Sequence, residues 1–388
     1  MDIDADLIQG VLEAGSGMKV LIKGMDCDKW VIFIPLFILF MIQAPVHAGP
    51  SKSDEFPSLI ESLRIQGPLD FCGEPVPIKT QEVRERLEKE LLLTLWDRPQ
   101  VILWLKRSPR FLGHIEKMLK ENGMPADLKY IAIIESALRP HVGSPKGAMG
   151  YWQFTGETGT KYGLIINDRI DERRNIYSST KAAIAYFKEL HETFESWTLA
   201  AAAFNMGENG LMSEIMLQGL TDYYRLYLPL ETQRYILRII SAKLVLSNPK
   251  KYGFDMEKED CYPELRAEPV EVNSDKEIPI RVIALAAKTD FKVIKDLNPE
   301  IRGYFLAPGN YKISVPEGTS KGFPARFEKY LKDSLSSREQ RVYVVKEGDN
   351  LFIIAEKLNI PLPALIIRNR LNPAQPIHPG DKLIIPNP

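Results

Sequence analysis

Apolar residues between positions 81 and 247 recur with helical spacing, which predicts a mainly helical segment. One stripe consists of Val83, Leu87, Leu91 and Leu95, with charged residues between them. The same spacing predicts further helices at 101–105, 115–119, 179–189, 197–204 and 231–246. The pair at 122–123, Asn-Gly, is a helix stop signal, so we expect a new helix to begin just after it.

That new helix, predicted from Pro125 to Arg139, is apolar on nearly all sides but carries one carboxyl among its apolar residues. Pro125 suits the first helical position, and Pro140 restricts the residue before it, so the helix should end at or before Arg139. A helix that is apolar all round is expected to be buried. Glu135 falls on its apolar face, although charged groups are rarely buried without a partner. The alternative is a glutamate that reaches the surface at the helix end.

Residues 144–154 follow as a loop rich in glycine and proline that ends in aromatic residues around one amide. Gly150 permits backbone conformations and close approaches that other residues forbid. Tyr151 and Trp152 offer flat faces suited to sugar rings. Gln153 offers two donors and an acceptor.

This sequence, Glu135-Ser followed by Ser144-x-x-Gly-Ala-x-Gly150-x-x-Gln153, resembles the family 1 lytic transglycosylases, which have a lysozyme-like fold and cleave peptidoglycan. The Trp before Gln153, together with the C-terminal module described below, resembles the membrane-bound lytic transglycosylase D subgroup. The resemblance implies that Glu135 is the catalytic acid/base. It also implies a set of substrate-binding residues: Ser144, Gly150, Gln153, Phe204, Asn205, Glu231 and Tyr235.

One position departs from the family pattern. Phe204 stands where the family usually has Tyr in a Tyr-Asn-x-Gly motif, so a hydroxyl and any hydrogen bond that it makes near Glu135 are lost. Taken singly, several of these residues also have purely structural explanations. Phe204 and Tyr235 would suit a core, Glu231 would cap the helix that follows it, and Gln153 would tie a loop to the backbone.

The family resemblance implies a mechanism with one essential acid, whereas most glycosidases use two. Glu135 would protonate the oxygen between N-acetylmuramic acid and N-acetylglucosamine with help from the substrate's N-acetyl group. It would then take a proton from the muramyl C6 hydroxyl, closing a 1,6-anhydro ring without water, metal or cofactor. Its apolar surroundings and helix C-terminal position should raise its pKa. The alternatives are a lysozyme-type hydrolase and a non-catalytic peptidoglycan-binding protein.

Two similar units are predicted after the helical segment, at 268–318 and 341–388. The second reads strand, helix, helix, strand and resembles a LysM module, which binds the N-acetylglucosamine-containing backbone of peptidoglycan or chitin. The first lacks the Gly-Asp cap and resembles a degenerate copy, either a spacer or a sugar site. Lys332–Gln340 between them is polar and predicts a hinge. The residues that match LysM are Tyr343, Val345, Gly348, Asp349, Leu351, Ile354, Ala355, Asn369, Leu371, Gly380, Leu383, Ile385 and Pro386.

The N-terminal residues 1–48 are predicted to be a secretory signal peptide. Lysines precede the apolar run Val31–Ile42, and Ala48 lies at a suitable cleavage site. The run is short for a membrane span, and an uncleaved anchor that holds the protein at the membrane is the alternative. Either reading implies the periplasm or cell envelope. Residues 49–80 are rich in Pro, Ser and Gly and predict a linker.

Composition and charge narrow the choice of partners. The chain has 388 residues, of which 45% are hydrophobic, so more than one domain is expected. The net charge of -1 and the absence of a long basic run argue against nucleic acid. The three cysteines lack metal-ligand spacing, and removal of Cys27 with the signal would leave Cys72 and Cys261 for a disulfide. The charged stretch 168–175 is either a solvated loop or a salt-bridge cluster.

Taken with the resemblance, these patterns predict a mainly α, lysozyme-like catalytic domain over 81–255 and small α+β (βααβ) LysM-type modules after it. The expected partner is the peptidoglycan glycan strand.

Overall fold

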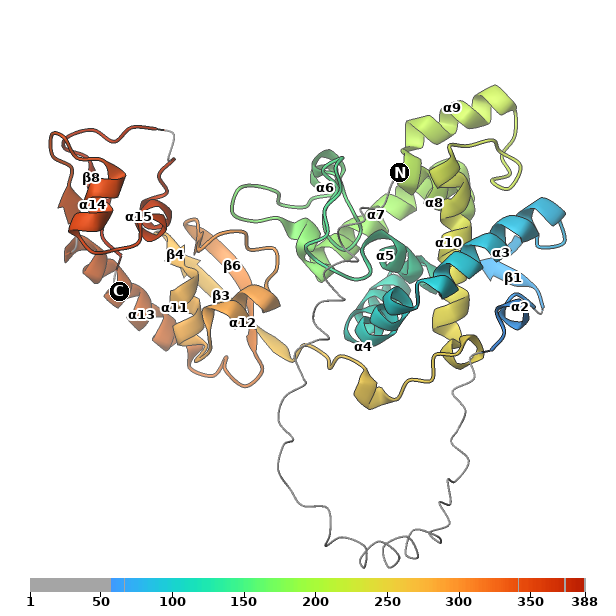
Figure 1. The fold of residues 1–388 in the computed structure, drawn as a ribbon, viewed down its shortest axis with the longest axis horizontal. Coiled ribbons are helices and arrows are strands. Elements are labelled where there is room, and N and C mark those ends of the chain that lie inside the picture. The colour runs from blue at the N-terminus through green and yellow to red at the C-terminus, as the bar shows by residue number, and fades with distance from the viewer. Residues whose placement is uncertain (1–56, 66, 341, 373–374, 387–388) are drawn as a thin grey trace, which may run out of the picture. The chain divides into compact units, whose positions relative to one another are not determined.

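The structure is a computed structural model that describes residues 57–386 except 66, 341 and 373–374 (Figure 1). The predicted signal peptide over 1–48 lies outside these residues. Among the helices that are described, none has both the length and the apolar character needed to cross a membrane. Three hydrophobic cores define a helical domain (57–260), a middle unit (267–316) and a C-terminal unit (342–386). The predicted mainly α domain with small α+β units is confirmed.

The helical domain begins with a short helix and a strand pair, and the rest consists of α-helices and 3-10 turns. In chain order the elements are α2 (Leu59–Ser62), β1 (Leu69–Phe71), β2 (Glu74–Val76), α3 (Gln81–Trp96), α4 (Arg98–Glu121), η2 (Ala126–Leu128), α5 (Lys129–Ser136), α6 (Gly156–Lys161), η3 (Glu172–Arg174), α7 (Ile176–Phe194), α8 (Trp197–Met206), α9 (Glu208–Gln218), α10 (Leu230–Ser247), η4 (Pro249–Tyr252) and η5 (Lys258–Asp260).

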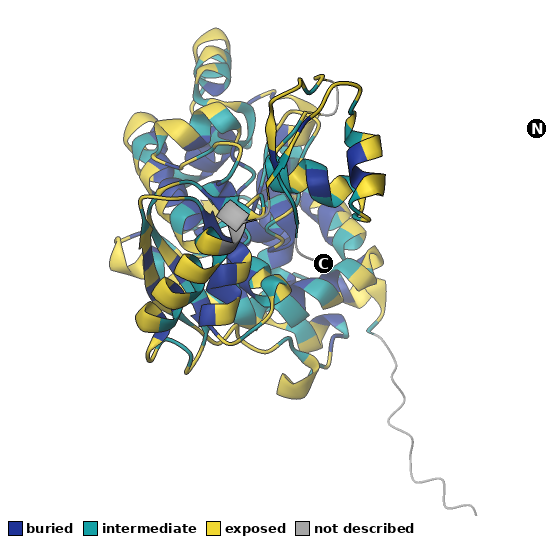
Figure 2. Cartoon of the chain, turned by 90° about the vertical axis from the view of Figure 1, so that its left-hand side faces the viewer, coloured by how far each residue is buried: buried dark blue, intermediate teal, exposed yellow. Residues whose placement is uncertain are grey.

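Helix α10 packs against α3, α5 and α8, which places it in the interior of the helical domain. On α8 the alanines from Ala200 to Ala203 are fully buried, because small side chains let neighbouring helices approach closely. All four residues of the predicted stripe on α3 are buried, which confirms that helix and its inward face. Figure 2 shows the same division, with buried residues on the inner faces of the helices and exposed residues outside.

The β1–β2 hairpin belongs to the helical domain, so the prediction of a linker over 49–80 is wrong for these residues. Phe71 and Val76 are 0% and 5% exposed within the domain's core. The strands are only three residues long, too short for a periodic pattern to show in the sequence. The disulfide that the sequence left possible is not formed, because Cys72 and Cys261 are both free. The Cys72 amide donates to Asp127, whereas the Cys261 thiol lies 3.9 Å from the carbonyl of Leu105.

In both the middle and the C-terminal unit, two helices lie in sequence between a first and a last strand that pair antiparallel, and the middle unit has a second short pair, β4–β5. The middle unit contains β3 (Ala267–Ser274), β4 (Ile278–Pro279), α11 (Ile280–Ala286), α12 (Phe291–Leu297), β5 (Phe305–Leu306) and β6 (Gly309–Pro316), with β3 paired to β6. The C-terminal unit contains β7 (Val342–Val344), α14 (Leu351–Lys357), α15 (Leu362–Asn369) and β8 (Lys382–Ile384), with β7 paired to β8.

The same asparagine contact closes both units, which supports the idea of a duplicated plan. In the middle unit Asn298, at the end of α12, donates to Ser314 O at 2.8 Å and accepts from the Ser314 amide at 2.7 Å. In the C-terminal unit Asn369, at the end of α15, makes the equivalent pair of bonds with Ile384 at 2.8 and 2.6 Å. Each side-chain amide also bonds the carbonyl four residues earlier.

The segment predicted as a hinge, 332–340, is instead the end of helix α13 (Phe323–Gln340). Phe323 and Phe327 are buried on the core of the middle unit, and Tyr330 and Leu331 pack beside them. The helical period is set by apolar residues at 323, 327, 330 and 331. These residues precede the polar segment that suggested a hinge.

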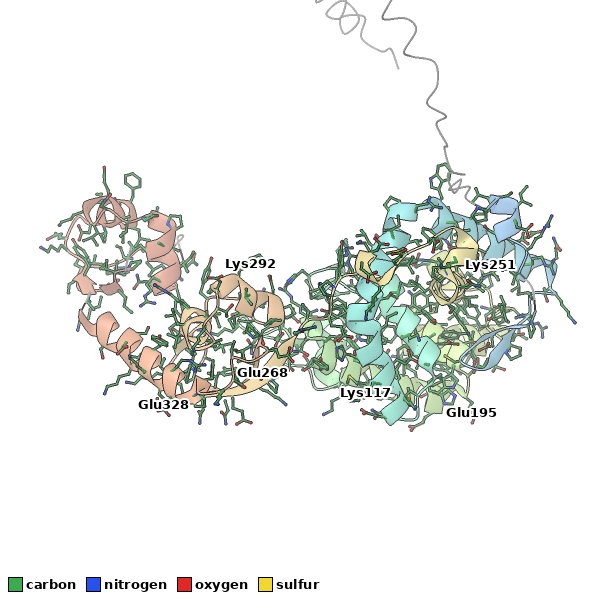
Figure 3. The ribbon with its side chains drawn as sticks, turned by 90° about the horizontal axis from the view of Figure 1, so that it is seen from below. Lys117, Glu195, Lys251, Glu268, Lys292 and Glu328 are labelled. Carbon is green, nitrogen blue, oxygen red and sulfur yellow. The ribbon has the colours of Figure 1, made fainter. Side chains whose placement is uncertain are left out.

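Charged side chains of both signs project from the surface, among them Lys117, Glu195, Lys251, Glu268, Lys292 and Glu328 (Figure 3). This mixture agrees with the net charge of -1.

Candidate active site

Glu135 lies in the last turn of α5, which ends at Ser136, before Arg139 as the sequence predicted. Ala137 and Leu138 both adopt left-handed backbone conformations, with φ of 52° and 57°. The Ala137 amide bonds the carbonyl of Ile133 at 2.8 Å and closes the helix at Ser136. Glu135 therefore sits at the helix end, half-buried, and lines a recess of about 440 Å³.

The hydroxyl of Tyr235 on α10 donates a hydrogen bond to Oε1 of Glu135. Burial is the largest influence on this carboxyl and raises its pKa from 4.5 to about 7. The bond from Tyr235 and the positive charge of Arg238 lower the pKa, while the negative charge of Glu231 raises it. Near neutral pH much of Glu135 therefore carries a proton, as a general acid requires. The direction agrees with the prediction from the apolar helix face.

Glu231, Tyr235 and Arg238 lie on one face of α10, because positions i, i+4 and i+7 share a helical stripe. Glu231 is mostly exposed and pairs with Arg238 at 2.6 Å, without capping the helix. Arg238 was not among the residues predicted from the sequence. Its spacing of three residues from Tyr235 was the signal that could have identified it.

The loop over 144–154 is held by backbone contacts and by two polar side chains. The Ser144 hydroxyl accepts from the Ala148 amide at 3.2 Å. The Gln153 side-chain amide donates to the carbonyls of Val142 and Gly150, both at 2.9 Å, so it ties the loop to itself. Ser136, the neighbour of Glu135, donates to the Tyr151 carbonyl at 2.9 Å and joins the loop to α5.

Tyr151 and Trp152 are core residues, so the expectation that their faces are suited to sugar rings is wrong. They are 3% and 0% exposed. The indole of Trp152 donates to the Thr180 hydroxyl of α7 at 3.0 Å, which satisfies its only polar atom inside the core.

Phe204 belongs to an aromatic cluster. The hydrogen bond to Glu135 comes from another residue, Tyr235. The Phe204 ring stacks on Phe187, with centroids 4.6 Å apart and an interplanar angle of 12°. The next residue, Asn205, accepts from the hydroxyl of Thr232 on α10 at 2.8 Å. Residue 204 has no hydroxyl, and the hydroxyl that bonds Glu135 belongs to Tyr235 on α10.

The centre of the charged stretch 168–175 is a buried salt-bridge cluster around Asp171, the second of the two expected alternatives, while Asp168 is exposed. Arg173 binds both carboxylate oxygens of Asp171, at 2.8 and 2.9 Å. The same guanidinium donates to the carbonyls of Gly147 and Phe154. Gly150 has φ of 83°, and a Cβ there would lie 1.9 Å from the Arg173 carbonyl oxygen. The cluster therefore fixes the loop over 144–154.

The structure joins only some of the predicted site residues. Tyr235 contacts Glu135, and Glu231 acts on its pKa. Asn205 is held against α10, whereas Ser144, Gly150 and Gln153 shape the loop beside α5. Of the predicted residues, Glu135 is the one that lines the 440 Å³ recess.

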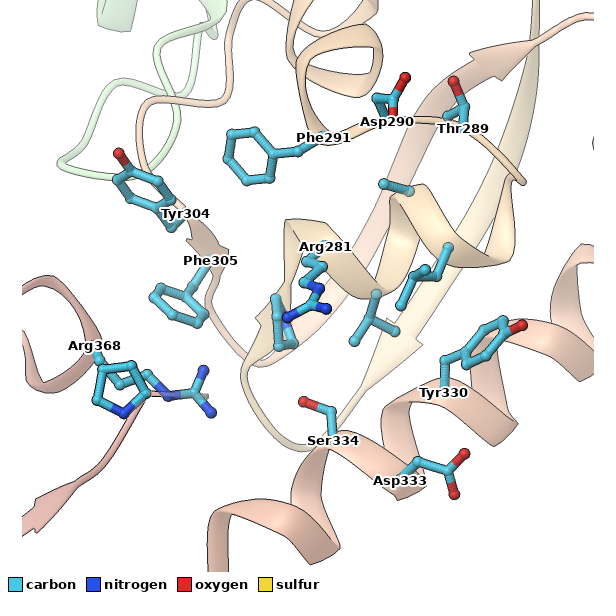
Figure 4. Close-up of a pocket in the computed structure, with 15 residues that line it drawn as sticks. Arg281, Thr289, Asp290, Phe291, Tyr304, Phe305, Tyr330, Asp333, Ser334 and Arg368 are labelled. Atoms are coloured by element: carbon cyan, nitrogen blue, oxygen red, sulfur yellow. The ribbon is translucent and has the colours of Figure 1, made fainter. Parts of the chain in front are cut away.

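A larger recess of about 690 Å³ lies away from these residues (Figure 4). It is lined mainly by the middle unit and α13, with the stacked rings of Phe291 and Tyr304 on one side. None of the predicted site residues lines it. Within the part of the chain that the structure describes, no three His, Cys, Asp or Glu side chains are grouped as metal ligands would be.

Comparison with known proteins gives two family matches and several relatives. Residues 114–225 match the transglycosylase SLT domain, and residues 343–386 match the LysM domain. Membrane-bound lytic murein transglycosylase D of Escherichia coli (strain K12) is 29% identical over 293 residues, which is 72% of this chain. The match spans 64% of the length of that relative. A putative tributyltin chloride resistance protein of Alteromonas sp. (strain M-1) is 31% identical over 117 residues, covering 29% of this chain and 56% of that protein.

A crystal structure of an inactive variant of lytic transglycosylase Slt from Pseudomonas aeruginosa matches with 19% identity and a TM-score of 0.27. It covers 39% of this chain and 26% of that one, and a score this low carries no argument. The two family matches agree with the motifs around Glu135 and with the strand–helix–helix–strand order of the C-terminal unit. The chain therefore contains a transglycosylase SLT domain and, C-terminal to it, a LysM domain.

Proposed function

We propose that this protein is a peptidoglycan lytic transglycosylase whose acid/base is Glu135. The observation that carries the proposal is a single carboxyl at the end of α5, lining a recess, with its pKa raised to about 7 and a hydroxyl bonded to one of its oxygens. The SLT match surrounds this residue, and the relative from Escherichia coli is named as a murein transglycosylase.

In the first step, protonated Glu135 gives its proton to the glycosidic oxygen between N-acetylmuramic acid and N-acetylglucosamine. Tyr235 occupies Oε1, which leaves Oε2 to carry the proton toward the substrate. As the C–O bond breaks, the substrate's N-acetyl oxygen attacks the anomeric carbon and holds it as a cyclic intermediate. The carboxylate that forms is stabilised by the Tyr235 hydroxyl and by the positive charge of Arg238.

In the second step, Glu135 removes the proton of the muramyl C6 hydroxyl, and that oxygen displaces the N-acetyl group. A 1,6-anhydro ring closes, the carboxyl is protonated again, and no water is consumed. Glu231 is a poor candidate for a second catalytic carboxylate, because it is mostly exposed and paired with Arg238. Two other acids line the recess, but Glu90 is paired with Arg234 and Asp97 caps α4. With Glu135 as the acid left for the reaction, a route that needs one acid is favoured over one that needs two.

The LysM domain would bind glycan strands and keep the SLT domain near its substrate, since a tethered second site raises the effective concentration. On this proposal the protein would act in the cell envelope. A lysozyme-type hydrolase remains the second candidate, because the same acid would also serve an attack by water on the intermediate.

The Glu135→Gln variant tests the assignment of the acid. It keeps the shape and the bond to Tyr235 but cannot deliver a proton. We expect normal folding, unchanged binding to sacculi and a loss of roughly 10²–10⁴-fold or more in turnover on purified peptidoglycan. Substantial turnover by this variant would rule out Glu135 as the acid. No turnover by the wild-type chain would instead favour a binding protein with an inert groove.

A further inference from the structure

The recess that holds Glu135 is lined by residues of α3 and α4 and by Arg139, which follows α5. Here Leu93, Gln100, Trp104 and Arg139 are called the arm of the recess. A volume of about 440 Å³ falls in the range of small-molecule sites, so the recess has room for more than the reacting bond.

Three arginines line the recess, and two of them are neutralised. Arg234 pairs with Glu90 at 2.6 Å, and Arg238 pairs with Glu231 at 2.6 Å. Among the described residues, no carboxylate lies within salt-bridge distance of Arg139. Within the described part of the chain, its guanidinium makes one hydrogen bond, of 3.2 Å from Nε to the Ser136 carbonyl.

A second cation, Arg107, adds to this local positive charge. Partial burial and the nearby charge of Arg139 lower the pKa of Arg107. It donates to the Ala137 carbonyl at 3.2 Å, so both guanidinium groups lie at the C-terminal end of α5. Each of the two arginines uses one guanidinium N–H group to cap the helix, because carbonyls at a helix end attract cations. The other guanidinium N–H groups of the exposed Arg139 are available to an anion.

The chemistry of the arm fits a short peptide with a free carboxylate better than a bare sugar. Leu93 offers an exposed apolar surface, 47% accessible, that suits small aliphatic side chains. Trp104 is only 8% exposed, which is too little for a sugar ring to stack on. Besides Glu135, two acids line the recess: Glu90 is paired with Arg234, and Asp97 accepts from the Gln100 amide as the cap of α4.

We propose that the arm between α3 and α4 binds the peptide stem of the muramic acid held at Glu135, with Arg139 pairing with a stem carboxylate. The inference rests on the proposed function, because muramic acid is the sugar that bears these stems. It makes Arg139 a specificity-determining residue. The main influences on the pKa of Glu135 are burial, Tyr235, Arg238 and Glu231, so the loss of Arg139 should change substrate binding and leave the proton transfer intact.

The test compares the full chain with Arg139→Gln and Arg139→Lys on two substrates, sacculi with their stems and amidase-treated glycan strands without them. For Arg139→Gln we expect kcat/KM on stem-bearing material to fall about tenfold, the effect of one charge-assisted hydrogen bond, through KM and with kcat within about twofold. On stripped strands it should equal wild type. Arg139→Lys should recover part of the loss, and the pH profile should not move.

Arg225→Gln removes an exposed arginine outside the recess and serves as the matched control, with no change on either substrate. Equal losses on both substrates would overturn the proposal in favour of a sugar subsite. No loss on either would overturn it outright while leaving the proposed function in place. If the wild-type chain cleaved neither substrate, the proposed function itself would fail. A melting curve for each variant separates these outcomes from misfolding.

Discussion

The raised pKa of Glu135 has a measurable consequence for stability, apart from any activity. The carboxyl titrates near its ordinary value of 4.5 in the unfolded chain and at about 7 in the folded protein. Because the folded state binds this proton more tightly, the group favours folding at low pH. That contribution is complete below 4.5 and is lost as the pH rises through the window from 4.5 to 7.

The size of the effect follows from the same two values. At 1.36 kcal/mol for each pKa unit, the wild-type protein loses about 3 kcal/mol of unfolding free energy across this window because of Glu135. Glu135→Gln has no proton to lose there. The variant should therefore gain stability relative to wild type as the pH rises, by at most about 3 kcal/mol, and the difference should be constant above pH 7.

Urea unfolding of wild type and Glu135→Gln at pH 4, 5, 6, 7 and 8 measures this difference, with the loss of helical circular dichroism as the signal. Glu264→Gln, a change at an exposed glutamate, controls for the altered net charge. A difference between wild type and Glu135→Gln that stays flat from pH 4 to 8 would refute the burial of this carboxyl and, with it, the physical basis for its role as an acid.

Three further predictions follow from contacts around the site and from the domain order. Tyr235→Phe removes a hydrogen bond that lowers the pKa of Glu135, so the alkaline limb of the pH profile of kcat/KM on peptidoglycan should move up by about one pH unit or more. An unmoved limb would contradict the hydrogen bond between Tyr235 and Glu135. Gly150→Ala places a Cβ 1.9 Å from a backbone oxygen and should lower the free energy of unfolding, measured with denaturant, by roughly 3 kcal/mol or more. Gly147→Ala has open space at its Cβ and should lower it by about 1 kcal/mol, and equal losses would show that the close approach at Gly150 is absent. Deletion of 341–388 should leave the melting of the SLT domain unchanged and weaken co-sedimentation with sacculi, and undiminished co-sedimentation would count against a binding role for the LysM domain.

Local patterns in the sequence were enough to predict the elements that carry the site. The apolar stripe on α3 follows the helical period, and its residues are buried as expected. Glu135 stood out because a carboxyl on an apolar helix is costly unless its pKa rises, and the structure raises that pKa. These inferences succeed because they depend on neighbours one or two helical turns away.

The features that were missed depend on contacts between distant residues. Trp152 is buried because Thr180, on α7, accepts its indole proton. Phe71 enters the core from a three-residue strand that has no detectable period. Arg238 joins the site only because α10 crosses α5, although its spacing from Tyr235 was visible. The end was predicted only as at or before Arg139, because its position at Ser136 depends on left-handed conformations at Ala137 and Leu138, which neither residue type favours.

The most direct test of the central claim is the mass of the soluble muropeptides that the purified chain releases from peptidoglycan. Ring closure by the C6 hydroxyl predicts fragments that end in 1,6-anhydro-muramic acid, each lighter by one water than a hydrolytic product. These fragments should disappear when Glu135→Gln replaces wild type. Fragments with reducing ends from the wild-type chain would contradict the transglycosylase account and assign the same site to a hydrolase.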